Sequence, residues 1–291
     1  MSLNNTYQLA SNPPTPMAWE IYEQIVMNEW NTLLSSEQGN ERSFQGFLER
    51  HPCMLPGAFM LTVTSGHMPL GCAVITQPIL PDYNYRVPDF MWLAMNSAAI
   101  QPVLIEIEAP VKQWFTKSGK PTAYLTQAID QLVKWRTWFG DPINVQKFRQ
   151  FYGIDGLHFR DFAFHPVYVL VYGRRKEPNS CPSQAASRHY MQGPDQTLMT
   201  YDRLKPDRNC SDLWCVRGKP GTWKAVSIPP TTQLNPIMAH DRSQIMGREE
   251  AIRINPLITE DRKAFLIARL QYWDEWAAKE NKGGWRLGDS E

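Results

Sequence analysis

The sequence lacks the features of membrane-spanning, secreted and strongly basic proteins. None of its apolar runs approaches the roughly 18 residues that a membrane-spanning helix needs. The segment 1–15 is polar and contains prolines, unlike a signal peptide, so we expect a cytoplasmic protein with no membrane partner. The net charge is only +1, so any contact with nucleic acid must come from a local basic surface rather than from overall attraction.

Cysteine is also scarce. The five cysteines are scattered and odd in number, which fits reduced thiols in a cytosol better than a disulfide framework. Cys210 and Cys215 flank four residues, but no second pair with zinc-finger spacing follows, so the sequence does not predict structural zinc. With 291 residues, of which 43% are hydrophobic, the chain can form the core of one large domain or of two.

Acidic residues stand on neighbouring predicted strands. Asp89 is followed, after a loop, by the apolar run 102–105 and then by Glu106, Ile107 and Glu108. Successive side chains alternate faces in a strand, so Glu106 and Glu108 point the same way and Ile107 points to the other face. Like charges held together are costly without a cation, and hard oxygen ligands suit Mg²⁺ or Mn²⁺. The alternative is a solvated sheet face with a turn aspartate, and this short pattern alone does not separate the two.

The predicted elements indicate an α/β protein. Periodicity predicts helices over 17–36, 40–52, 123–139, 181–192 and 259–280, and strands over about 71–80, 87–95, 102–108, 166–173, 197–201, 213–217 and 222–228. The nearly unbroken apolar strand 166–173 is typical of a central or parallel position. The apolar stripe of the terminal helix packs either on the sheet or against another subunit; the sequence leaves both open, and we expect a homo-oligomer.

The order of these elements and acids resembles the common core of PD-(D/E)XK nucleases, the restriction-endonuclease-like fold, in which helices flank a mixed sheet. More specifically, the chain resembles the Shedu family of bacterial anti-phage nucleases from about Glu41 to Leu204. The matching stretches are 41–52, 87–90, 105–110, 128–132 with Trp135, 170–174 and 200–204. The resemblance implies a nuclease-like core over 40–204. The predicted elements place an N-terminal tail and helix over 1–39 before this core, and a hairpin and long helix over 205–291 after it, where the sequence becomes aromatic and proline-punctuated.

The resemblance implies a metal-dependent DNA endonuclease. Asp89 and Glu106, with the carbonyl of Ile107, would bind one or two Mg²⁺ (or Mn²⁺) ions. Glu108 stands where most members of the superfamily carry lysine, which leaves open whether it is a ligand, the general base or a sign of lost activity. Gln131 on the following helix would orient the backbone or a metal-bound water, unless it is an ordinary solvent-facing residue.

Basic residues beside the acidic strand are the expected contacts with DNA. Lys112, Lys117 and Lys120 would bind phosphates, although such clusters are also ordinary surface charge. Lys112 is near enough in sequence to replace the missing lysine of the superfamily, or it is a solvated loop residue. Glu41 either approaches the same site from the first core helix or only stabilises the start of that helix.

The same acidic residues allow two alternatives to a nuclease, a scaffold without cleavage and a glycosidase. A nuclease fold without cleavage, serving as a DNA-binding or phage-sensing scaffold, is the main alternative, because the usual lysine is missing. A glycosidase that uses Glu106 and Glu108 as acid and base is disfavoured, since residues two apart on one strand point in parallel and do not flank a substrate bond.

Overall fold

A computed structural model of the chain describes residues 7–37, 39–63, 65–176, 181–279 and 288–291. Residues 1–6 of the predicted tail and Glu280, at the end of the predicted terminal helix, lie outside this set. Within the described residues, no helix combines the length and the apolar character needed to cross a membrane.

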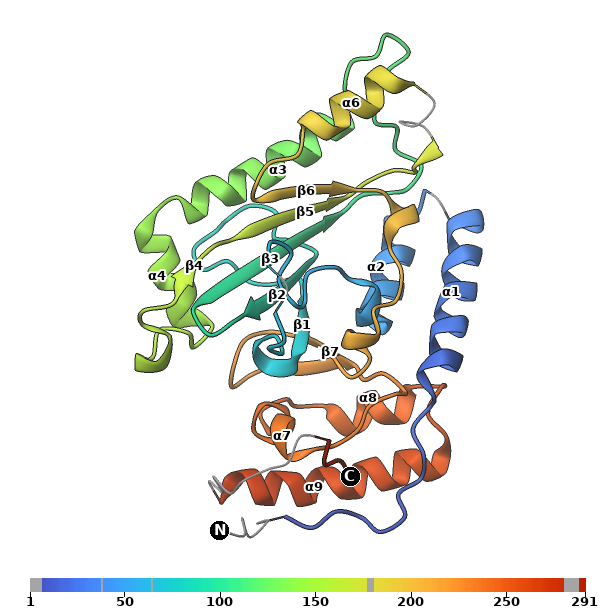
Figure 1. Cartoon of the computed structure of the whole chain (residues 1–291), viewed down its shortest axis with the longest axis vertical. Helices are drawn as coiled ribbons and strands as arrows, with labels where there is room; N and C mark the ends of the chain where they lie inside the picture. Colours follow the sequence, from blue (N-terminus) through green and yellow to red (C-terminus); the bar gives the residue numbers. More distant parts are fainter. Residues whose placement is uncertain (1–6, 38, 64, 177–180, 280–287) are drawn as a thin grey trace.

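A central mixed sheet of eight strands organises the molecule (Figure 1). Its order is β6-β5-β3-β2-β1-β7-β8, and β4 pairs with β3 off this path. The strands are β1 (Ala73–Thr76), β2 (Phe90–Met95), β3 (Ala99–Ile107), β4 (Ala163–Phe164), β5 (Val167–Val171), β6 (Gln196–Met199), β7 (Trp214–Arg217) and β8 (Lys224–Ser227). β2 is antiparallel to β1 and β3, whereas β3, β5 and β6 run parallel. β5 was predicted to be central or parallel, and its parallel pairing on both sides confirms the second of these. The predicted α/β fold class, a mixed sheet flanked by helices, is therefore confirmed.

Helices cover both faces of the sheet (Figure 1). They are α1 (Trp19–Ser36), α2 (Glu41–Arg50), α3 (Ala123–Phe139), α4 (Pro142–Phe151), α6 (Pro182–Tyr190), α7 (Pro236–Ser243), α8 (Arg248–Ile254) and α9 (Glu260–Ala278). The side chains of α1 and α2 form one core cluster with one face of β3, and those of α3 and α4 form a second with the opposite face. The sheet is therefore the middle layer between two hydrophobic cores.

Strand β3 carries the alternation that the sequence predicts. Ile105 and Ile107 are fully buried in the core beneath α1 and α2, whereas Leu104 belongs to the core beneath α3. The antiparallel register pairs Phe90 with Ile105, so Asp89 stands opposite Glu106 on the neighbouring chain segment. The predicted start of strand β2 at residue 87 is wrong by three residues, because regular pairing within the strand begins at Phe90.

The C-terminal segment extends the same sheet. β7 pairs with β1 in parallel, and β7 and β8 form the predicted antiparallel hairpin. Helix α9 begins after Thr259, whose side chain accepts a hydrogen bond from the amide of Arg262, as an N-cap should. Its buried residues Leu266 and Trp273 join the core cluster on the α3 side of the sheet, with residues of α7 and α8. This stripe is therefore buried within the chain itself.

Candidate functional site

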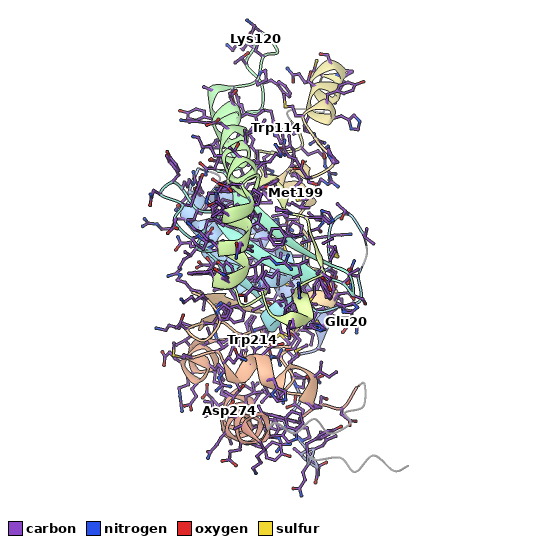
Figure 2. The ribbon with its side chains drawn as sticks, turned by 90° about the vertical axis from the view of Figure 1, so that its left-hand side faces the viewer. Glu20, Trp114, Lys120, Met199, Trp214 and Asp274 are labelled. Atoms are coloured by element: carbon purple, nitrogen blue, oxygen red, sulfur yellow. The ribbon has the colours of Figure 1, made fainter. Side chains whose placement is uncertain are left out.

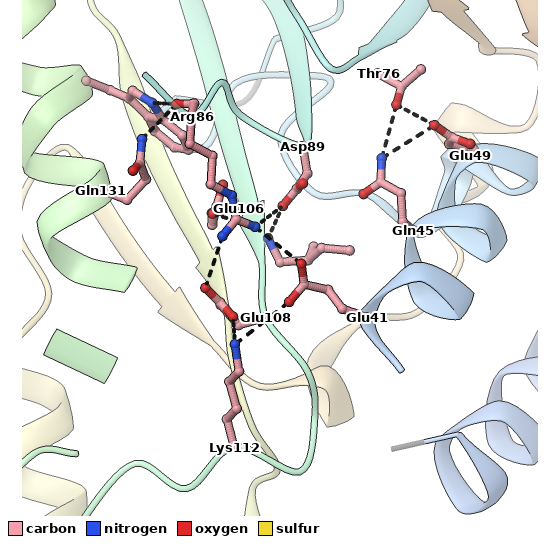
Figure 3. Close-up of polar contacts among 12 residues, drawn as sticks. Glu41, Gln45, Glu49, Thr76, Arg86, Asp89, Glu106, Glu108, Lys112 and Gln131 are labelled. Carbon is pink, nitrogen blue, oxygen red and sulfur yellow. Dashed lines mark hydrogen bonds and ion pairs between the residues drawn. The ribbon is translucent and has the colours of Figure 1, made fainter. Parts of the chain in front are cut away.

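Four carboxylates from three parts of the chain meet at one end of strands β2 and β3 (Figure 3). Asp89 directly precedes β2, Glu106 lies near the end of β3, and Glu108 follows that strand. Glu41 is the first residue of α2. The structure therefore brings the three acids predicted from the strands together and adds Glu41, as one of the two readings of that residue proposed.

Arg86 lies among these acids, and the sequence reasoning gave it no role. Its Nη2 atom lies 3.1 Å from Glu106 Oε1, 3.2 Å from Glu41 Oε1 and 4.0 Å from Asp89 Oδ2, while Nη1 lies 3.6 Å from Glu108 Oε1. Because Glu106 and Glu108 both face one guanidinium, they point to the same side, as predicted. The only sequence signal for Arg86 was its position three residues before Asp89.

The carboxylate of Asp89 is fixed by the backbone of β3. The amide of Ile107 donates a 2.8 Å hydrogen bond to Asp89 Oδ2. The amide of Asp89 in turn donates to the carbonyl of Ile105, at 3.0 Å. Burial raises the pKa of the Asp89 carboxyl to about 7, against the opposing effects of the Ile107 amide and Arg86. At neutral pH, the protonated and ionised forms of this carboxyl are therefore both populated.

Glu106 is the most completely buried acid of the group. Its side chain is 0% exposed, and neither carboxylate oxygen has a hydrogen-bond donor among the described residues, although Oε1 is within ion-pair distance of Arg86. Burial and then the charge of Asp89 raise its pKa well above the usual range. Burial and the nearby Glu108 likewise raise the pKa of Glu41. Such an acid, buried without hydrogen bonds, is costly to ionise unless a further cation approaches it.

Lys112 belongs to this cluster and is not a solvated loop lysine. Its ammonium donates a hydrogen bond to Glu108 Oε2 and lies 3.8 Å from Glu41 Oε2. An ammonium group therefore accompanies Glu108, as one of the two interpretations of Lys112 predicted. Four carboxylates and two cations leave an excess of two negative charges when every group is ionised.

Gln131 acts on the backbone of the site. Its Nε2 donates to the carbonyl of Arg86 at 2.8 Å, and Nε1 of Trp135, one turn further along α3, donates to the same carbonyl at 3.0 Å. Gln131 therefore holds the backbone of Arg86, which matches the first of the three possibilities predicted for it. These two donors fix the segment from which the side chain of Arg86 extends.

The other two predicted DNA-binding lysines lie away from the acids. Lys117 and Lys120 are exposed in a turn closed by hydrogen bonds between Thr116 and Lys120. In Figure 2, Lys120 is at one extreme of the molecule, beyond Trp114. No ion pair of either lysine is recorded among the described residues.

Tyr201 is a second residue to which the sequence reasoning gave no role. It is fully buried, its ring stacks on Trp30 at 5.7 Å, and its hydroxyl has no hydrogen-bond partner among the described residues. Burial and then the charge of Asp89 raise the pKa of its hydroxyl well above the usual range. Its position in the matching stretch 200–204 was the available signal.

The acidic cluster offers oxygen donors of the kind that bind divalent cations. With the side chains placed as described, no group of three acidic, histidine or cysteine side chains in the described part of the chain is arranged to hold a metal ion. The chemistry of the donors nevertheless fits Mg²⁺ or Mn²⁺, because they are carboxylate oxygens and the buried oxygens of Glu106 lack hydrogen-bond donors. The guanidinium of Arg86 contacts these same acids (Figure 3).

Comparison with known proteins identifies the family of the segment that carries these residues. No curated protein sequence matches the chain. Residues 38–204 match the family described as "Shedu protein SduA, C-terminal", and this match includes Glu41, Asp89, Glu106 and Glu108. Because it spans more than half of the 291 residues, the chain belongs to the Shedu family.

Proposed function

We propose that this protein is a metal-dependent DNA endonuclease that hydrolyses phosphodiester bonds in bacterial anti-phage defence. The observation that carries the proposal is the convergence of Asp89, Glu106 and Glu108 at one end of a mixed sheet, within the segment that matches the Shedu family. The family suggests defence, and the acids supply the chemistry. The PD-(D/E)XK assignment rests on this same order of strands and acids.

Asp89 and Glu106 would hold the Mg²⁺ or Mn²⁺ ion, with the carbonyl of Ile107 as a third oxygen donor. Such an ion, when bound, polarises the scissile phosphate and lowers the pKa of a coordinated water. The protein contributes fixed donors: the Ile107 amide holds Asp89 Oδ2, and burial holds Glu106 at the same end of the sheet. Neutralising the excess negative charge of the cluster favours binding of a divalent ion.

Glu108 is proposed to accept the proton of the attacking water. Its carboxylate is 8% exposed and is paired with Lys112, so it lies at the margin of the cluster, more accessible than Glu106. The ammonium of Lys112 keeps Glu108 oriented and is also available to a phosphate oxygen. In this role, Glu108 and Lys112 together replace the single lysine of most superfamily members.

DNA would enter from the side of Lys112. Beyond it, Lys117 and Lys120 project from an exposed turn and would contact more distant phosphates. The sequence predicts no base-reading helix, so we expect recognition of backbone, ends or structure rather than of base sequence.

A catalytically silent scaffold that binds DNA or senses phage is the second candidate. The contacts of Arg86 favour it, because a guanidinium among the acids stabilises them without any metal. In that case the fold and the DNA-binding lysines persist, but hydrolysis does not.

Cleavage of DNA separates the two candidates. Linear and closed-circular DNA would be incubated with Mg²⁺ or Mn²⁺ and the parent protein, Asp89→Asn, Glu106→Gln or Glu108→Gln. Asp130→Asn is the matched control, since this acid is 54% exposed on α3 and pairs only with Lys134 among the described residues. We expect metal-dependent nicking or cleavage that the first two variants abolish and the control retains. Equal products from the parent and all the variants would refute the catalytic assignment.

A further inference from the structure

The contacts of Arg86 differ from those of the structural arginines in this chain. Arg136 makes two hydrogen bonds of 2.8 and 2.9 Å to Asp195, and Arg248 makes two of 2.8 and 2.7 Å to Asp274. Each of these pairs is bidentate, the strong arrangement for guanidinium and carboxylate. Arg86 instead spreads its charge over four acids, and its only hydrogen bond to them, at 3.2 Å, is to Glu41.

The contacts of Arg86 therefore supply charge but little hydrogen bonding. Glu106 is the extreme case, since its oxygens have an ion-pair partner at 3.1 Å but no hydrogen-bond donor among the described residues. A cation that contacts several oxygens without directional bonds performs the task of a metal ion, but with one charge instead of two. When all four acids are ionised, one guanidinium and one ammonium leave two of their negative charges uncompensated.

The side chain of Arg86 is partly exposed to solvent, whereas its backbone is held by two hydrogen bonds. Gln131 and Trp135 both donate to its carbonyl, which fixes the main chain. The side chain itself is 45% exposed, so rotation about its own bonds would carry the guanidinium into solvent without movement of the backbone. Figure 3 shows the guanidinium inserted between Glu106, Glu108 and Asp89, with its backbone near Gln131.

We infer that Arg86 is a resident counter-ion that occupies the acidic site in the metal-free protein and that a divalent cation must displace. This inference rests on the proposed metal site. It makes Arg86 a competitor of the metal: the guanidinium keeps the acids together before the ion arrives and sets the metal concentration at which the site fills. Removing the guanidinium should therefore tighten metal binding, whereas removing a supporting residue would weaken it.

Binding of Mn²⁺ to the full chain at pH 8, measured by calorimetry, tests the inference. We expect Arg86→Gln to lower the dissociation constant by about tenfold or more, which corresponds to about 1.4 kcal/mol. Arg86→Lys, a safeguard in case the glutamine variant does not fold, keeps one charge on a single nitrogen and should tighten binding by about threefold. Arg253→Met removes a guanidinium that is 59% exposed and paired with Glu249, and should leave the constant unchanged.

A second readout follows from thermodynamic linkage. If Arg86 stabilises only the metal-free protein, Arg86→Gln should raise the equilibrium constant for unfolding, measured with urea in EDTA. The factor of this increase should equal the factor by which the substitution lowers the dissociation constant of Mn²⁺. In saturating Mn²⁺, the stabilities of parent and variant should become equal. A purely structural arginine would leave the difference in place.

The outcomes separate this inference from the proposed function. Tighter binding by the Arg86 variants than by the parent supports the inference. Equal or weaker binding by the variants, when the parent binds Mn²⁺, overturns it and leaves the nuclease proposal standing. Binding by Arg86→Gln but not by the parent supports the inference and favours the silent scaffold. No binding by any of them, or binding that survives Asp89→Asn, overturns both.

Discussion

The substitution Asp89→Asn should flatten the dependence of stability on pH. The folded-state pKa of Asp89 is about 7, whereas its ordinary value is 3.8. The folded protein therefore binds this proton more tightly than the unfolded chain. The stability that this proton contributes is fully present below the unfolded-state pKa of Asp89. It is lost as the pH rises through the folded-state pKa. The asparagine carbonyl can still accept the 2.8 Å hydrogen bond from the amide of Ile107.

The expected magnitude follows from the two pKa values. The free energy of unfolding falls by roughly 1.4 kcal/mol for each pH unit between the two pKa values. About two such units lie between pH 5 and the folded-state pKa, so the loss between pH 5 and pH 8 is roughly 3 kcal/mol. The side chain is only 16% exposed, so screening by solvent reduces this figure little. Because Glu106 and Glu41 titrate in the same cluster, the variant should keep part of the slope that they contribute.

Urea unfolding in EDTA at several pH values between 5 and 8 measures this effect. The parent should lose stability as the pH rises, and Asp89→Asn should lose less, by on the order of 2 kcal/mol. Asp130→Asn, in which an exposed acid is changed, should follow the parent. A parent stability that is constant or increases over this range, or identical slopes for the parent and Asp89→Asn, would refute the buried-acid reasoning.

Three further predictions concern the site and its support. At pH 8, Mn²⁺ at about 100 times its dissociation constant should raise the thermal midpoint of the parent by roughly 5–10 °C in a fluorescence scan, and Glu106→Gln should not respond; an equal shift in that variant would place the ion elsewhere. Gln131→Leu should lower the free energy of unfolding, measured with urea, by about 1 kcal/mol. A double-mutant cycle with Trp135→Phe should give a non-additive loss, since both side chains donate to the carbonyl of Arg86, and strict additivity would contradict this shared role. Arg262→Met should lower the free energy of unfolding by about 3–5 kcal/mol, because it leaves the buried Glu291, 3% exposed, without its ion-pair partner. A decrease below about 1 kcal/mol would show that the pair contributes little.

The sequence predicted the elements that have strong local signals. Helix α3 runs from Ala123 to Phe139 as predicted, because Thr122 caps its start and Gly140 ends it. Helix α4 was missed, although Asp141 accepts a hydrogen bond from Ile143 and Pro142 occupies the first turn, both common at helix starts. The motif that ends one helix here also begins the next.

The prediction of β1 over 71–80 was too long at both ends. Cys72 and Gln77 have positive φ angles of 50° and 47°, which non-glycine residues seldom adopt, and the strand is confined to the residues between them. Composition does not reveal such backbone angles, because they are imposed by tertiary contacts. The regular alternation in β3, by contrast, follows from burial on both faces and was predictable.

The acids of the site could be predicted, but not the cation among them. Asp89 and Glu106 come from adjacent strands, where pairing follows from the order of elements. The placement of Arg86 depends on the donors Gln131 and Trp135 on a distant helix, a contact that no local pattern encodes. The sequence left two possibilities for Lys112, a replacement for the lysine that most PD-(D/E)XK nucleases carry or a solvated loop residue. Its ammonium lies beside Glu108, so it is not a solvated loop residue.

The central claim is that Asp89 and Glu106 form the binding site of a divalent cation. Crystals of the protein grown at about pH 8 and soaked in Mn²⁺ would test it most directly, through anomalous diffraction at the manganese edge. We predict an anomalous peak within coordination distance of both carboxylates, with the guanidinium of Arg86 moved away from Glu106. No peak at this end of strands β2 and β3, with the guanidinium still in place under saturating Mn²⁺, would contradict the account.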